Sequence, residues 1–464
     1  MKVIGRLRVW VCLVLVCCVA GSVAADVRLP QVFGANMVLQ RDRAVPVWGW
    51  ADPGEEVTVQ IAGQSVRTKA DEAGKWTIRL EPMAVGGPYR MVVAGKNRLT
   101  LANVLVGEVW LCSGQSNMER SLKRLGTYER QIEWANKPNI RLFHVPKKAS
   151  QQPADDVEAQ WKVCNPETVA DFSAVAYFFG RYLHEHLSVP VGLIESAWGG
   201  TRIEPWIPPS FYDRKWAYPN KRAHQQPSVL YNAMVHPLVP YAIRGAIWYQ
   251  GESNCFQKDR MLYYDKFRAM VQGWRKLWGQ GPFPVYFVQL APYRYSARSR
   301  GLDSKELALF WEAQTACLKI PNTGMAATVD IGDVNDIHPK NKHEVGRRLA
   351  LWALAKDYGR KDIVYSGPMY ESMSRERNKV RLSFKHTGSG LMSRDGRELT
   401  WFEVAGGDRK FYPARASIEG DSVVVFCEKV SVPVAVRFGW DERAQPNLCN
   451  KEGLPAVPFR TDRW

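Results

Sequence analysis

The chain has 464 residues, 46% of them hydrophobic, which is enough for two or three domains with buried cores. Its formal charge is +17, but the basic residues are spread along the chain without a long Lys/Arg run or a nucleic-acid-binding motif. We therefore expect no nucleic-acid partner. No run beyond the N-terminus is long and apolar enough to cross a bilayer.

The N-terminus has the pattern of a signal peptide over residues 1–25. Three basic residues precede an apolar run at 9–20, and small residues follow up to Ala24 and Ala25. This pattern predicts export and cleavage near Ala24 or Ala25. The apolar run is too short for a comfortable membrane span, so we expect a soluble periplasmic or secreted protein.

Six cysteines lie outside the signal, far apart and without CxxC spacing, so neither a zinc site nor thioredoxin-like chemistry is expected. Export permits disulfides, and Cys427 with Cys449 can form a local pair. Buried free thiols fit the sequence equally well.

Residues 26–103 form the first predicted domain. Short strand-like runs at 37–40, 45–50, 57–61, 76–80 and 89–93 are separated by turn residues such as Asp52-Pro53-Gly54. Regular short strands with turns between them predict a small β-sandwich-like domain. It contains no cluster of catalytic residue types.

Residues 104–359 form the second predicted domain, in which strands and helices alternate. The strand candidates are 104–112, 140–145, 189–196, 243–250, 285–290 and 325–331, and the helix candidates are 173–187, 261–278, 304–320 and 341–358. This alternation predicts an α/β fold with a mostly parallel sheet covered by helices. Functional sites in such sheets gather at the carboxyl ends of the strands.

Residues 360–464 return to strand-like runs, at 380–384, 401–404, 422–426 and 434–438. These runs predict a C-terminal β domain.

Ser116 is the candidate nucleophile. It follows the apolar strand 104–112 in the run Ser113-Gly114-Gln115-Ser116-Asn117, and helix-compatible residues come next. A serine on a strand-to-helix turn projects its hydroxyl from the strand end, beside helix N–H groups that favour an oxyanion. Helix capping by Ser116 is the structural alternative.

Two other strand ends carry candidate oxyanion and substrate groups. Trp198-Gly199-Gly200-Thr201 allows a ligand to approach backbone N–H groups, so Gly200 can donate to an oxyanion. In Trp-Tyr-Gln-Gly-Glu-Ser-Asn (248–254), Gln250 can donate its amide N–H to the same oxyanion. Glu252 in that run can orient a base or bind substrate, and Asn254 is a further substrate candidate.

His338 is the candidate general base. It precedes an amphipathic helix, and carboxylates lie two and five residues earlier, at Asp336 and Asp333. A histidine held by an acid suits proton transfer. Asp336 is the nearest candidate acid; Asp333, Glu252 and a dyad steadied by a backbone carbonyl are alternatives.

The four runs together resemble the sialate O-acetylesterase family of carbohydrate esterases, which belongs to the SGNH hydrolases. The matching residues are Gly-Gln-Ser-Asn-Met (114–118), Trp-Gly-Gly-Thr (198–201), Trp-Tyr-Gln-Gly-Glu-Ser-Asn (248–254) and Asp-Ile-His-Pro (336–339). The resemblance covers nearly the whole mature chain. It implies a three-layer α/β/α SGNH-hydrolase domain between two β-sandwich-like domains, with no metal or other cofactor.

The resemblance also implies roles for residues. Ser116 would be the nucleophile and His338 the base, and the Ser116 and Gly200 N–H groups with the Gln250 side chain would form the oxyanion hole. One position departs from the pattern: Asn335 stands where many SGNH hydrolases carry the acid.

The implied function is removal of O-acetyl groups from sugars, with O-acetylated sialic acids as the first expectation. Arg202 can hold a sialic acid carboxylate or pair with Glu204, and Trp198 can stack on a sugar ring. An acetyl-xylan or other polysaccharide deacetylase is the alternative enzyme. A carbohydrate-binding protein without turnover is the alternative outside enzymes.

Overall fold

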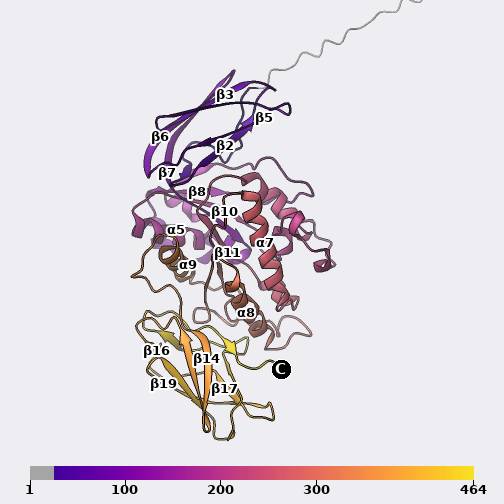
Figure 1. Cartoon of the computed structure of the whole chain (residues 1–464), viewed down its shortest axis with the longest axis vertical. Coiled ribbons are helices and arrows are strands. Elements are labelled where there is room, and N and C mark those ends of the chain that lie inside the picture. The colour runs from indigo at the N-terminus through magenta and orange to yellow at the C-terminus, as the bar shows by residue number, and fades with distance from the viewer. Residues whose placement is uncertain (1–25) are drawn as a thin grey trace, which may run out of the picture.

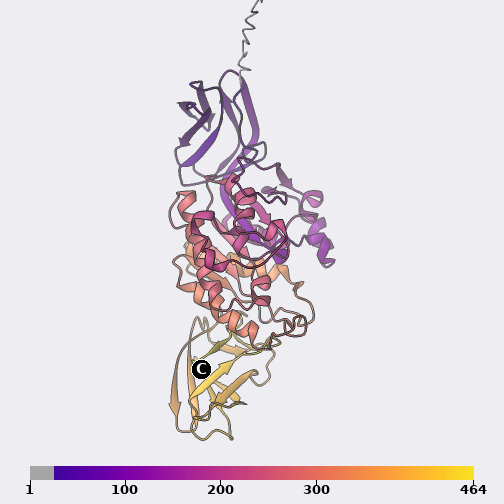
Figure 2. The ribbon, with the colours of Figure 1, turned by 90° about the vertical axis from the view of Figure 1, so that its right-hand side faces the viewer.

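The computed structural model describes residues 26–464, so the predicted signal peptide lies outside the described residues. The molecule is elongated (Figures 1 and 2). Two β regions, one from each end of the chain, lie at opposite ends of a central region of helices and strands. Within residues 26–464, no helix combines the length and the apolar character that a membrane span requires.

The N-terminal β region is built from strands with one buried face. In β3 (Glu56–Ile61), Val57, Val59 and Ile61 are buried and the residues between them are more exposed, as a half-buried strand requires. The other strands are β1 (Val38–Gln40), β2 (Val45–Trp50), β4 (Gln64–Lys69), β5 (Lys75–Leu80) and β6 (Gly86–Ala94). β6 pairs with the first half of β7 (Arg98–Gly114), and the domain boundary expected at 103/104 falls within β7.

The central sheet has the order β13-β12-β11-β7-β10-β8-β9. Its members besides β7 are β8 (Lys137–His144), β9 (Trp161–Cys164), β10 (Val191–Ala197), β11 (Gly245–Tyr249), β12 (Val285–Val288) and β13 (Thr323–Ala326). Every neighbouring pair is parallel except β8 with the edge strand β9. The prediction of a mostly parallel sheet is therefore confirmed.

Helices cover both faces of this sheet. The longer ones are α5 (Ala174–Leu187), α7 (Leu262–Trp278), α8 (Glu306–Ala316) and α9 (Lys342–Lys356). The short ones are α1 (Ser116–Glu119), α2 (Leu122–Leu125), α3 (Glu129–Glu133), α4 (Pro166–Ala170) and α6 (Glu252–Phe256). Tyr286 of β12 contacts Trp352 of α9, whereas its neighbour Phe287 contacts Phe267 of α7. Because adjacent strand residues point to opposite faces, α9 and α7 pack on opposite sides of the sheet.

The carboxyl ends of β7, β10 and β11 meet at one edge of the sheet, as the parallel registers require. Gly114 ends β7 with φ +143°, and a Cβ there would lie 2.1 Å from the carbonyl oxygen of Tyr249 in β11. Only glycine permits this close approach, which brings Ser116 beside the end of β11.

The C-terminal β region has its own apolar core, formed by residues such as Val380, Leu382 and Phe438. Its strands are β14 (Met369–Glu376), β15 (Lys379–Lys385), β16 (Leu391–Ser393), β17 (Phe402–Ala405), β18 (Phe411–Pro413), β19 (Arg415–Glu419), β20 (Ser422–Phe426), β21 (Ala435–Phe438), β22 (Leu448–Asn450) and β23 (Phe459–Arg460). Cys427 and Cys449 are not bonded to each other, and all six described cysteines are free thiols.

Candidate active site

Ser116 and His338 meet in the folded chain although they are far apart in the sequence. The distance from His338 Nε2 to Ser116 Oγ is 3.0 Å, which is hydrogen-bond length. Ser116 opens α1 directly after β7, and His338 lies in the loop between β13 and α9. Both residues are partly exposed, so a ligand can reach them.

Two groups of opposite charge flank the other ring nitrogen of His338. Asp336 Oδ1 lies 3.4 Å from Nδ1 and accepts the backbone N–H of His338 at 3.0 Å. Arg120 Nη2 lies closer to Nδ1, at 2.9 Å. Burial and the positive charges of Arg120 and Lys342 lower the pKa of His338 to about 4, against the opposing effect of Asp336. The imidazole is therefore neutral at pH 7.

Of the candidate acids, Asp336 is the one that lies beside His338. Asp333 accepts the backbone N–H of Asn335 at 2.9 Å, and its carbonyl accepts the N–H of Asp336 at 3.0 Å, so it shapes the turn. Glu252 is buried and accepts from Asn117 Nδ2 at 2.5 Å.

A buried polar chain joins the nucleophile turn to the histidine loop. Asn117, next to Ser116, donates to Glu252 and to the carbonyl of Ile337 at 3.0 Å, and it accepts from Lys342 Nζ at 2.5 Å. Burial lowers the pKa of Lys342 to about 7 and raises the pKa of Glu252. Each of these contacts fixes the position of Ser116 relative to His338.

The Gly199-Gly200 turn packs against the nucleophile. A Cβ on Gly199 would lie 3.2 Å from Ser116 Cβ and 3.0 Å from Glu119 Oε2. Gly200 has φ +75°, and its N–H donates to Gln115 Oε1 at 3.1 Å. The candidate oxyanion donor Gly200 thus lies beside Ser116, with an amide oxygen in the acceptor position.

The structure directs Gln250 away from an oxyanion. Its side chain is fully buried, and Nε2 donates to the carbonyl of Thr201 at 3.0 Å and to Asn254 Oδ1 at 2.7 Å. Both N–H donors of the amide are used, so the expected contact with an oxyanion is not available. Asn254 is also buried, and it donates to Glu204 and Asp259 rather than facing a ligand.

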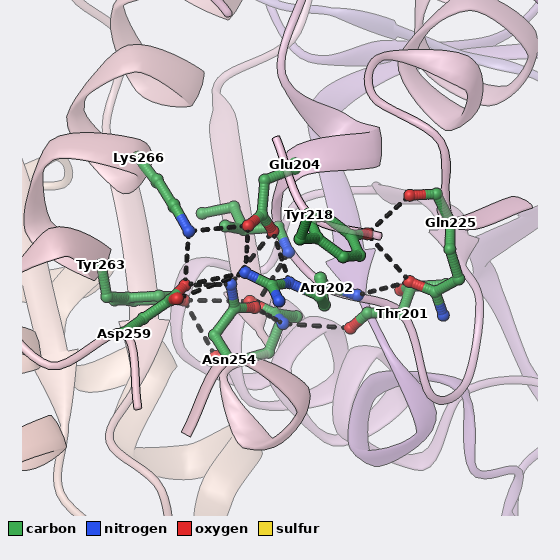
Figure 3. A network of polar contacts seen from close by, with 11 residues as sticks. Thr201, Arg202, Glu204, Tyr218, Gln225, Asn254, Asp259, Tyr263 and Lys266 are labelled. Carbon is green, nitrogen blue, oxygen red and sulfur yellow. Dashed lines mark hydrogen bonds and ion pairs between the residues drawn. The ribbon is translucent and has the colours of Figure 1, made fainter. Parts of the chain in front are cut away.

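Arg202 belongs to a buried ionic cluster, shown in Figure 3 with Glu204, Asp259 and Lys266. Its guanidinium pairs with Glu204 and lies 3.2 Å from Asp259 Oδ1, while Lys266 Nζ is 2.7 Å from both acids. Burial alone would raise the pKa of Glu204, but Arg202 and Lys266 lower it below its ordinary value. Of the two roles open to Arg202 in the sequence, its contacts are those of the structural one, the pair with Glu204.

Three aromatic side chains in or near the candidate runs, Trp198, Trp206 and Tyr249, differ in exposure. Trp206 and Tyr249 are fully buried. Trp198 is partly exposed and stacks on His224 with ring centroids 4.8 Å apart. Because Trp198 precedes Gly199, which packs on Ser116, it is the aromatic side chain of the three that remains available to a sugar.

Sequence reasoning missed two site residues, Arg120 and Lys342. Arg120 comes four residues after Ser116, and the bond from its backbone N–H to the Ser116 carbonyl places it one helical turn away, a spacing that could have identified it. Lys342 is the first residue of α9 and shares no helical turn with His338, so this signal does not extend to it.

A serine hydroxyl bonded to a neutral imidazole, at the carboxyl ends of a parallel sheet, is the arrangement of a serine hydrolase of the α/β class. A family model described as carbohydrate esterase, sialic acid-specific acetylesterase matches residues 106–355. The chain belongs to this family and is a carboxylic ester hydrolase.

Similar proteins share most of the chain. Human sialate O-acetylesterase is 30% identical, with 94% of this chain and 93% of the human protein covered. The mouse sialate O-acetylesterase is 32% identical, over 77% of this chain and 78% of the mouse protein. The crystal structure of a carbohydrate acetylesterase from Xanthomonas citri has a TM-score of 0.89 and 40% identity, covering 94% of this chain and all of that one.

Proposed function

We propose that this protein is a serine esterase that removes O-acetyl groups from sialic acids. The observation that carries the proposal is the 3.0 Å hydrogen bond between Ser116 Oγ and His338 Nε2. The similarity of the chain to sialate O-acetylesterases supports sialic acid as the sugar.

In the proposed reaction, His338 Nε2 removes the proton from Ser116 Oγ as that oxygen attacks the acetyl carbonyl. The negative oxygen of the tetrahedral intermediate accepts a hydrogen bond from the Gly200 N–H, which leaves Gln115 Oε1 for it. It accepts a second hydrogen bond from the Ser116 N–H. The Ser116 N–H lies in the first turn of α1, where N–H groups have no intrahelical partner. These are two of the three donors expected from the sequence, and the third, the Gln250 side chain, takes no part in this proposal.

Collapse of the intermediate forms an acetyl-enzyme, which water then hydrolyses. His338 gives its proton to the departing sugar oxygen, which leaves an acetyl ester on Ser116. Water, activated by the same imidazole, then releases acetate. Asp336 stabilises the imidazolium that forms in each half-reaction, because its carboxylate lies 3.4 Å from Nδ1.

We further propose that residues 104–359 form an SGNH-hydrolase domain, with residues 26–103 and 360–464 as β domains on either side. The continuity of β7 ties the first of these to the catalytic sheet. The N-terminal sequence pattern supports removal of residues 1–25 and a periplasmic or secreted location.

A second candidate substrate is an acetylated polysaccharide such as xylan. The Xanthomonas citri relative, at 40% identity, is described as a carbohydrate acetylesterase, which does not restrict the sugar to sialic acid. The deciding experiment measures acetate released from O-acetylated sialic acid and from acetylated xylan by the wild type and by Ser116→Ala. We expect release from the sialic acid to dominate and to fall by several orders of magnitude in Ser116→Ala. Unchanged activity of that variant would disprove the assignment of Ser116.

A further inference from the structure

We propose that Arg120 binds the carboxylate of an acidic sugar substrate and that this binding releases His338 for catalysis. This inference rests on the proposed function, because it concerns the same Ser116–His338 pair. It assigns to Arg120 the substrate contact that was expected at Arg202.

The position of Arg120 favours a role at the site. Arg120 directly follows α1 as its C-cap residue, and its backbone N–H donates to the carbonyl of Ser116 at 2.9 Å. Its guanidinium reaches His338 Nδ1 at 2.9 Å. Within residues 26–464 it forms no ion pair with any carboxylate, whereas Arg202 has two. A partly exposed guanidinium without a carboxylate partner is a ready site for one.

The contact with Nδ1 also decides which ring nitrogen of His338 carries the proton. Arginine donates but cannot accept, so the Nδ1 that it contacts must be unprotonated. The proton of the neutral ring is then on Nε2, which donates to Ser116 Oγ and cannot remove its proton. Catalysis needs the opposite arrangement, with the proton on Nδ1, where Asp336 Oδ1 at 3.4 Å can accept it.

A substrate carboxylate resolves this conflict. A bidentate pair with a carboxylate is stronger than a single hydrogen bond to a neutral imidazole, so the substrate draws the guanidinium from Nδ1. Asp336 then becomes the remaining partner of Nδ1, and Nε2 becomes an acceptor for the Ser116 proton. Three charged groups act on the ring: Arg120 and Lys342 disfavour its protonation, and Asp336 favours it.

The test compares an O-acetylated sialic acid with the same compound carrying a carboxamide in place of the carboxylate. For the wild type we expect kcat/KM for the acid to exceed that for the amide by about 10- to 100-fold, the range of charge-assisted hydrogen bonds. In Arg120→Met the ratio falls towards one, and the acid limb of the pH profile moves to higher pH because a positive charge near His338 is lost. Arg124→Met is the matched control, since this arginine lies four residues further on with an exposed side chain, and it keeps the wild-type ratio.

The acidic sugar can be a sialic acid or a uronic acid, and O-acetylated galacturonic acid distinguishes the two. If its turnover exceeds that of the sialic acid, the substrate is a uronic acid; if its turnover is lower, the substrate is a sialic acid. A ratio near one in the wild type would overturn the proposal without use of any variant. An unchanged ratio in Arg120→Met would overturn it as well. p-Nitrophenyl acetate has no carboxylate, so its turnover is slow and depends on the fraction of molecules in which Arg120 has left Nδ1. Loss of this slow turnover in Ser116→Ala tests the proposed function separately.

Discussion

One substitution, Glu204→Gln, can upset the charge balance of the buried ionic cluster. The cluster consists of Arg202, Glu204, Asp259 and Lys266. The Glu204 carboxylate accepts from Lys266 Nζ at 2.7 Å, from Arg202 Nε at 3.2 Å and from Asn254 Nδ2 at 3.0 Å. With Asp259 the cluster holds two positive and two negative groups, so it is neutral. Glutamine in place of Glu204 leaves one uncompensated positive charge in the interior.

Removal of one partner from a buried pair costs about 3–5 kcal/mol in the free energy of unfolding. Each kcal/mol lowers the melting temperature of a domain of 150–250 residues by about 2–4 °C, so we expect a decrease of about 6–20 °C. Urea denaturation and thermal unfolding followed by circular dichroism measure both quantities. The matched control is Glu185→Gln in α5. Glu185 is exposed and lies 3.7 Å from the partly exposed Arg181, so this pair should contribute about 0.5 kcal/mol or less.

A double variant tests the charge balance itself. Glu204→Gln with Lys266→Met restores neutrality, so its loss of stability should be smaller than the sum of the two single losses. A free energy of unfolding for Glu204→Gln within about 1 kcal/mol of the wild type would contradict a cost of unbalanced charge, and so would two losses that simply add. Because the pKa of Glu204 is lowered on folding, its contribution is complete above the ordinary glutamate pKa and is lost as the pH falls below it.

Three further predictions concern the site. The kcat/KM for p-nitrophenyl acetate should rise with pH through an apparent pKa near 4 and then level off, because His338 must be neutral to act as a base; a limb near pH 6.5 would contradict this. Asp336→Asn should lower kcat about 10- to 100-fold, the range of a charge-assisted contact with the imidazolium, while Asp333→Asn, measured alongside, should change kcat less. Gly199→Ala should lower kcat by about 10- to 100-fold because its Cβ crowds Ser116, whereas Gly407→Ala, where a Cβ meets no atom within 4 Å, should leave kcat as in the wild type.

Much of the central region could be predicted from the sequence, because its strands are continuous apolar runs and its helices have clear ends. The helix expected at 173–187 is α5 (Ala174–Leu187), and the strand expected at 285–290 is β12 (Val285–Val288). Strands with little burial were missed. In β4 (Gln64–Lys69), β14 (Met369–Glu376) and β19 (Arg415–Glu419) no residue is buried, so no apolar alternation marks them.

The meeting of Ser116 and His338 could also be predicted, because both follow strands whose carboxyl ends lie at one edge of a parallel sheet. The orientation of the Gln250 and Arg202 side chains could not be predicted from the sequence. Their partners are Thr201 after β10, Asn254 in α6 and Asp259 in the loop after α6, and the sequence does not show that these segments close over one buried cluster. A polar residue after a strand is as consistent with a buried network as with a ligand site.

The 17 residues of β7 extend for about 55 Å, and they belong to both the N-terminal sheet and the catalytic sheet. A hinge between these sheets would have to break the ladder of a strand that ends two residues before Ser116. We infer that the two sheets exchange their amide hydrogens as one cooperative unit, because the backbone of β7 is hydrogen-bonded in both of them. A partner that pulls on the N-terminal region would therefore exert its force directly on the turn that carries the nucleophile.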